Sequence, residues 1–188
     1  MRKYLRHSLI TGVTTFIISV LINFSSNAVL EFSPLAVSFV LLFFIVLLGI
    51  AFDIVGTAAA SGEEAPFHAM ASDKVVGAKQ SIWLVRHADR VASFSNDVVG
   101  DIAGTISGAI AASIVFRLAV TYPQVQESIA NTLLIGLVAA ITVGGKAYAK
   151  SFAIKRSTEI LYVTGRVLYA LEKVGLRIAK TDKAKNRK

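Results

Sequence analysis

The longest apolar stretch of the chain covers residues 35–57 and most constrains what the chain can fold into. It contains the run SFVLLFFIVLLGIAF, and its one ionisable residue is Asp53, near the far end. A helix of about 20 residues crosses the hydrocarbon core of a bilayer, so this stretch is long enough to span one. The sequence therefore predicts a membrane protein.

The composition of the whole chain favours the same class. The 188 residues are 54% hydrophobic, and a mean hydropathy of +0.63 is too high for a soluble domain of this size. Cysteine is absent, which excludes a disulfide framework and a thiolate metal site. The net charge of +8 comes from the chain ends and one loop, a pattern typical of contact with anionic lipid rather than nucleic acid.

Three further stretches resemble membrane spans, so we predict an all-α membrane protein with four transmembrane helices. They cover residues 9–30, 98–120 and 129–150. A cleaved signal peptide is the competing interpretation of the first stretch, because Ser26 and Ala28 have the spacing that a signal peptidase prefers. We interpret it as a retained span.

Two segments outside the spans have the periodicity of amphipathic helices. Residues 58–96 form a polar, mixed loop whose Trp83 suits a headgroup boundary. The apolar positions that recur in this loop are Val75, Ala78, Ile82 and Val85. In residues 154–180 the predicted apolar face consists of Ile160, Val163, Val167, Leu171, Val174 and Ile178.

These expectations divide the chain into three parts. Residues 1–34 hold a basic lead and an extra N-terminal span. Residues 35–153 form a transmembrane core of three helices, with the juxtamembrane loop at 58–96. Residues 154–188 hold the second amphipathic helix and a basic tail that we expect to be disordered.

The distribution of Lys and Arg sets the expected orientation. The N-terminal lead, the 58–96 loop and the C-terminal segment are rich in both, whereas the turns at 31–34 and 121–128 have neither. The positive-inside rule then places both termini in the cytoplasm. Arg117, near the outer end of its span, is an exception that can snorkel to the interface.

A face of small residues and carboxylates runs along residues 93–117. Asp97, Asp101, Gly104 and Gly108 fall within about 60° of one another on an α-helix. Such small-xxx-small faces, here called a glycine zipper, let membrane helices approach closely. An acid inside a span is a functional-site hypothesis, and a structural ion pair in a helix bundle is the alternative.

Three ionisable groups share one depth in this topology. Asp53, Asp101 and Lys146 each lie a few residues from the cytoplasmic end of a span. At 1.5 Å per residue they lie roughly 4–6 Å inside the boundary. An unpaired charge in the bilayer costs on the order of 2.5–3.5 kcal/mol, so we expect Asp53 or Asp101 to pair with Lys146.

Several chemistries stay open for this cluster. Its carboxylate, amide and hydroxyl oxygens are hard ligands suited to Mg²⁺. Either a cation binds once the lysine moves or deprotonates, or Lys146 replaces the cation and locks the bundle. Coupling to protons or monovalent ions is a third possibility. The candidate metal ligands are Asp53, Ser93, Asn96, Asp97 and Asp101, and the candidate charge partner is Lys146.

Three short motifs, taken in order, resemble those of a known family. Residues 52–58, FDIVGTA, are similar to a helix-ending FSxSETAL pattern. Residues 77–93, GAKQSIWLVRHADRVAS, are similar to AKR…LL…P(D/E)RLLS, and residues 145–153, GKAYAKSFA, to GEIxPKxxA. The family is that of the CorB/cyclin-M (CNNM) magnesium transporters, and the resemblance covers about residues 35–171.

This resemblance implies a homodimer in the inner cell membrane that transports Mg²⁺. Two glutamates of the family motifs fall on Gly56 and Lys146, and a proline falls on Ala149. The family's nucleotide-binding domains are not expected, because the chain ends after one further helix. We therefore expect a transporter-like protein for Mg²⁺ or another divalent cation, with its site near the cytoplasmic ends of the spans. The alternative is a non-transporting structural or regulatory protein of the same fold.

Enzymatic motifs are not apparent in the sequence. It shows no nucleophile–base arrangement, phosphate-binding loop or dinucleotide fingerprint, so we do not expect an enzyme. The expected partners are the lipid bilayer, a second copy of the chain and a divalent cation.

Overall fold

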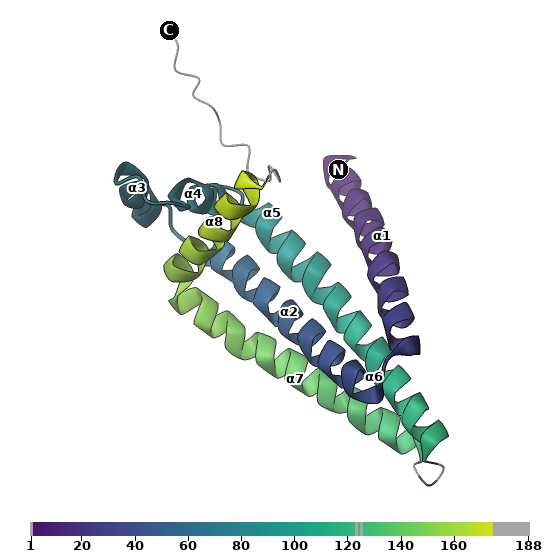
Figure 1. The fold of residues 1–188 in the computed structure, drawn as a ribbon. Coiled ribbons are helices and arrows are strands. Elements are labelled where there is room, and N and C mark those ends of the chain that lie inside the picture. Colours follow the sequence, from purple (N-terminus) through teal and green to yellow (C-terminus); the bar gives the residue numbers. More distant parts are fainter. Residues whose placement is uncertain (1, 123, 125, 175–188) are drawn as a thin grey trace. The chain divides into compact units, whose positions relative to one another are not determined.

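The computed structural model describes residues 2–122, 124 and 126–174, and within these residues every regular element is helical (Figure 1). This confirms the all-α prediction. The elements are α1 Arg2–Phe32, α2 Leu35–Ser61, α3 Ala65–Ser72, α4 Ala78–Arg86, α5 Ala88–Ala92, η1 Ser93–Gly100, α6 Asp101–Thr121, α7 Glu127–Lys155 and α8 Ser157–Lys173.

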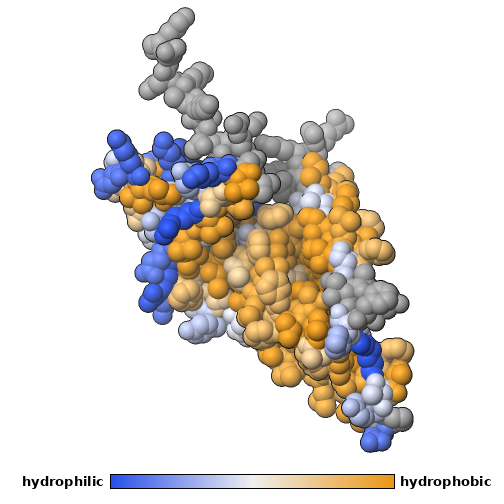
Figure 2. Space-filling view, viewed as in Figure 1, coloured by the Kyte–Doolittle hydropathy of each residue, from blue (hydrophilic) through white to orange (hydrophobic). Residues whose placement is uncertain are grey.

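Three of the described helical segments are long and apolar enough to cross a membrane: Leu35–Ser61, Ala88–Thr121 and Ser128–Lys155. A shorter apolar stretch, Leu9–Ser25, lies within α1. The prediction of membrane-spanning helices is therefore confirmed, whereas the fourth span stays a prediction. Hydrophobic side chains cover the long helices in Figure 2, and hydrophilic ones gather over α3 and α4.

Proline sets two of the helix boundaries. Pro34 separates α1 from α2, because it lacks an N–H group and disfavours helical geometry in the residue before it. Its carbonyl accepts a hydrogen bond from the Val37 N–H at 3.0 Å, which begins α2. Pro66 occupies the first turn of α3, where an N–H donor is not needed.

The chain divides into two compact units. Unit 1 comprises Met1–Phe52 and Asp97–Ala147, and unit 2 comprises Asp53–Asn96 and Tyr148–Lys188. The three parts expected from the sequence followed chain order. Within the described residues α8 belongs to the same unit as the central loop, because α2 and α7 each continue from unit 1 into unit 2, and the three-part division stays a prediction.

The core of unit 1 lies between α2, α6 and α7. Helix α6 buries every fourth residue, and these residues are Ile102, Ile106, Ile110 and Ile114. At Gly49 of α2, an added Cβ would lie 2.9 Å from the Ala103 Cβ, so the two helices meet closely there. Gly104 and Gly108 have no atom within 4 Å of an added Cβ. The described residues therefore pack α6 through its isoleucines and Ala103, not through the expected glycine zipper.

Arg117 ties together the end of unit 1 that holds the α1–α2 turn. Its Nη2 donates to the Ser33 carbonyl at 2.7 Å, and its Nη1 donates to the buried Ser38 Oγ at 3.2 Å. The guanidinium thereby satisfies polar groups of the turn, which would otherwise be costly in an apolar setting. Arg117 is thus a structural bridge between α6 and the start of α2, whereas its snorkelling to the interface stays a prediction.

Unit 2 has its own small core. It consists of side chains from α3, α4 and α8 together with the last turns of α2 and α7, and the fully buried members include Ala58, Phe67, Ala153 and Leu161. Phe67 lies in α3, which confirms that part of the 58–96 loop is helical. These short helices are stable only because they share this core, since isolated helices of such length are marginal in water.

Helices α4 and α8 cross at very short range in unit 2. An added Cβ at Gly165 of α8 would meet the Ser81 Oγ and lie 2.6 Å from the Gly77 carbonyl oxygen. Ser81 Oγ donates to the Leu161 carbonyl at 2.9 Å, and Gln80 Nε2 donates to Glu172 Oε2 at 2.8 Å. Gly77 has φ = 90°, a left-handed conformation that other residues rarely adopt.

The predicted apolar face of α8 is not the face that packs within unit 2. Leu161 and Gly165 are buried, whereas Val163, Val167 and Val174 are 59%, 54% and 84% exposed. The reason is Gly165, whose missing side chain lets the backbone of α4 approach, which a valine would prevent. Ile178 of the predicted face, and the basic tail, lie outside the described residues.

Candidate functional site

Three of the candidate ligands lie on an element that the sequence did not predict. Ser93, Asn96 and Asp97 belong to η1, a π-helix of 8 residues that continues into α6. Such π segments within longer helices are rare and are frequent at functional sites. The wider turn also changes the angular spacing on which the predicted face through Asp97 and Asp101 depended.

Asp53 is buried near the end of the apolar part of α2. Its side chain is 3% exposed, and its Oδ2 has no hydrogen-bond partner among the described residues. An ionised carboxylate in such a place is costly unless something neutralises it. A proton, a cation or a hydrated cation can do so.

Asn96 lies against the same helix in unit 2. An added Cβ at Gly56 would meet its Oδ1 and lie 2.8 Å from its Cγ, so the amide occupies the space that a side chain at Gly56 would fill. The Oδ1 is buried and, like the Asp53 Oδ2, has no partner among the described residues. The sequence did not predict this role for Gly56.

Asp53 and the contact with Asn96 at Gly56 lie on the same side of α2. Asp53 and Gly56 are three residues apart, which places them on the same side of the helix, about 4.5 Å apart along its axis. Because Asn96 contacts the helix at Gly56, a carboxylate oxygen and an amide oxygen approach the same strip of α2. Unit 2 therefore holds two buried oxygens, one on α2 and one on a side chain packed against α2, that lack a hydrogen-bond partner among the described residues.

The remaining candidates are placed differently. Asp97 and Asp101 are exposed, and Ser93 and Lys146 are half-buried. Within unit 1, the described side chains form no ion pair between Asp101 and Lys146. Asp101 is adjacent to Ile102, which takes the core face of α6, so its carboxylate turns outward and the pairing expected for it is not formed.

Clusters rich in acidic or histidine side chains are not part of this site. Among the residues that the structure describes, no three His, Asp or Glu side chains come close enough to hold a metal ion.

A second buried amide, which was not among the candidates predicted from the sequence, lies in unit 1. The Oδ1 of Asn131, on α7 in unit 1, is buried and lacks a hydrogen-bond partner among the described residues. A polar amide inside a predicted span was the signal that could have found it.

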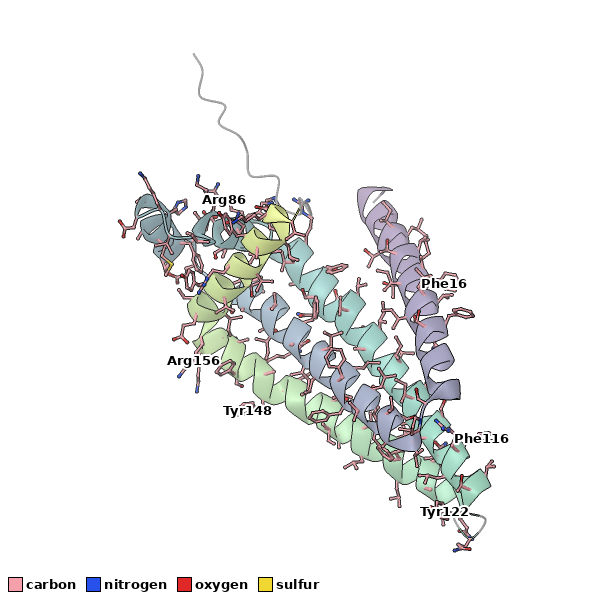
Figure 3. All side chains as sticks on the ribbon, viewed as in Figure 1. Phe16, Arg86, Phe116, Tyr122, Tyr148 and Arg156 are labelled. Carbon is pink, nitrogen blue, oxygen red and sulfur yellow. The ribbon has the colours of Figure 1, made fainter. Side chains whose placement is uncertain are left out.

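An exposed network of ion pairs lies outside the spans. Glu64 Oε2 is 3.0 Å from His68 Nε2, and Arg86 Nε donates to the same oxygen at 3.0 Å. Arg86 lies on α4 (Figure 3), so the ion pair joins the start of α3 to α4. The hydrogen bond with His68, followed by that from Arg86, lowers the pKa of Glu64 from 4.5.

Fold and site together define a class of protein. The described residues form an all-helical protein with several helices of membrane-spanning character and, on one of them, a buried carboxylate oxygen that has no hydrogen-bond partner within the described part of the chain. Comparison with family models, curated proteins and solved structures finds no match for the chain.

Proposed function

We propose that this multi-pass membrane protein binds a divalent cation, Mg²⁺ or one of similar chemistry, and acts as a transporter-like protein in the inner cell membrane. The observation that supports this proposal most is the pair of buried oxygens, Asp53 Oδ2 and Asn96 Oδ1, neither of which has a hydrogen-bond partner among the described side chains. The motif resemblance to the CorB/cyclin-M family supports the choice of Mg²⁺.

The proposed chemistry follows from these donors. A carboxylate and an amide oxygen are hard ligands, and Mg²⁺ is commonly held by one or two carboxylates while keeping several waters. The cation would remove the cost of the buried Asp53 charge, and Asn96 would supply a neutral ligand. The Ser93 hydroxyl, from the same π-helix as Asn96, is a further candidate ligand.

Flux into proteoliposomes tests this proposal. The parent chain, Asp53→Asn and Asp89→Asn are compared with a Mg²⁺-sensitive dye inside the vesicles. Asp89→Asn is the matched control, because it removes the same charge from an exposed position that is not among the candidate ligands. We expect Asp53→Asn to abolish most of the flux and Asp89→Asn to retain it. Equal flux in all three proteins would reject the site.

A non-transporting protein of the same fold is the second candidate. It is favoured by Lys146, a half-buried lysine within a helix of membrane-spanning length. In this version the ammonium group takes the place of the cation and stabilises the bundle. Replacement of Lys146 by glutamate should then create Mg²⁺ binding that the parent lacks, measured by calorimetry. Binding by the parent itself would remove the main support for this candidate.

A further inference from the structure

The outward side of α8 carries two chemically different strips. At 100° per residue, Val163, Val167 and Val174 fall within about 40° of one another and form what we call the valine strip. Arg166 and Lys173 fall about 90° to one side and form the basic strip. All five side chains are exposed, so no described part of the chain covers either strip.

The basic strip has no acidic partner among the described residues, because both acids of α8 are engaged elsewhere. Glu159 Oε2 receives a hydrogen bond from Arg156 at 3.1 Å, and Glu172 receives one from Gln80 at 2.8 Å. The Arg166 guanidinium carbon lies 5.9 Å from the centre of the Tyr162 ring, and Arg166 forms no ion pair with a described acidic side chain. The strip therefore offers two cations to an external anionic surface.

Chain connectivity decides which surface lies within reach. One residue, Arg156, separates α8 from α7, whose segment Ser128–Lys155 has the length and hydropathy of a membrane span. Helix α8 therefore begins directly after a segment of membrane-spanning character, within reach of the bilayer surface that such a span would cross. Figure 3 shows Arg156 at this junction. A helix with a narrow apolar strip beside cations lies in the plane of such an interface.

We propose that the outward face of α8 lies on the anionic leaflet of the membrane, with the valine strip at the acyl boundary and the basic strip at the lipid phosphates. A second copy of the chain is a poorer occupant, since three valine side chains supply much less than the roughly 800 Å² per partner of a stable protein interface. This proposal does not depend on the cation site, because it concerns only α8 and its neighbours.

Single-cysteine spin labels test the proposal on the full chain, which has no cysteine of its own. Val167→Cys and the control Tyr169→Cys are each labelled and placed in nanodiscs. Both positions are exposed, so the labels leave the α4–α8 contact intact, and they lie about 160° apart on the helix. Collisions with oxygen report contact with lipid, and collisions with a nickel chelate report contact with water.

In discs of phosphatidylcholine with phosphatidylglycerol, we expect the label at position 167 to be reached by oxygen and shielded from nickel, and the label at 169 to show the reverse. Pure phosphatidylcholine should reduce this shielding. Removing the basic strip with Arg166→Gln and Lys173→Gln should weaken the membrane-bound state about fivefold per charge in the mixed discs. The basic segment at 175–188 is the same in every protein compared, so its charge is constant.

Three outcomes would overturn the proposal. The first is equal nickel accessibility at positions 167 and 169 in the mixed discs, which would mean that the valine strip faces water. The second is shielding that is identical in both lipids and in the charge-removed variant. The third is shielding that occurs only in discs with two copies, which would identify a second chain as the cover.

Discussion

Gly56 shows at the scale of single residues how an absent side chain can shape a site. The Asn96 amide occupies the space beside its Cα, on the helix that carries the buried Asp53. Arg117 shows the opposite case, in which a long side chain supplies donors to a helix turn that lacks them. Both roles depend on partners that are far away in the sequence.

Gly56→Ala should destabilise the protein and displace Asn96. An added methyl group would overlap the amide, and overpacking of this kind costs about 1–3 kcal/mol. Unfolding of the purified protein in mixed micelles measures the change. Gly104→Ala is the matched control, because no atom lies within 4 Å of its added Cβ. Equal effects of the two changes would mean that Asn96 does not occupy this space.

Arg117→Gln should loosen the α1–α2 turn. The change removes charged donors from the Ser33 carbonyl and the Ser38 hydroxyl, and hydrogen bonds to charged groups contribute about 1.5–3 kcal/mol. We expect faster amide hydrogen exchange at the start of α2 and a lower free energy of unfolding. Arg156→Gln is the control, since its exposed ion pair with Glu159 should contribute at most about 1 kcal/mol.

At the scale of helices, the short helices of unit 2 stabilise one another through their contacts. The Gly77 and Gly165 backbones bring α4 and α8 together, while the Glu64–Arg86 ion pair joins the start of α3 to α4. The first contact is steric and does not depend on pH. The second is electrostatic and is open to solvent, so acid should weaken it selectively.

The contact between α3 and α4 should weaken in acid. Because folding lowers the pKa of Glu64, this group stabilises the fold above its ordinary pKa of 4.5, and the contribution is lost as the pH falls through the folded-state value. Amide hydrogen exchange in α3 should therefore accelerate, relative to α8, as the pH falls below about 4.5. Glu64→Gln should remove this pH dependence. An unchanged profile in the variant would assign it to another group.

Membrane topology is the property that belongs to the whole molecule. Helices of membrane-spanning character are present, while the orientation stays a prediction from the positive-inside rule. The number of spans depends on α1, of which Leu9–Ser25 is the apolar part.

Cysteine labelling in intact cells should place the loops on opposite sides of the membrane. A cysteine at Gln124 should react with an impermeant maleimide from outside, and one at Ser72 should react only after permeabilisation. Both residues are exposed, and the natural chain has no competing cysteine. A cysteine at His7 that also stays protected would indicate a retained first span. External labelling at Ser72 would reverse the predicted orientation.

Much of the fold could be predicted from the sequence, because membrane spans depend on local properties. Apolar runs of sufficient length identify helices α2, η1–α6 and α7. The candidate site could be predicted from the sequence only in part. Asp53 and Asn96 were both named as candidates, but their relation through Gly56 was not, and the outward direction of Asp101 followed from packing at Ile102.

The sequence by itself determined that the chain is helical and apolar enough for a membrane, since hydropathy and helix length act within each segment. Only the tertiary structure decided which side of α8 is buried, what Arg117 contacts and which buried oxygens lack partners. These features depend on the close approach of helices from distant parts of the chain. Small residues such as Gly56 and Gly165 permit that approach, and their partners are visible only once the helices are packed.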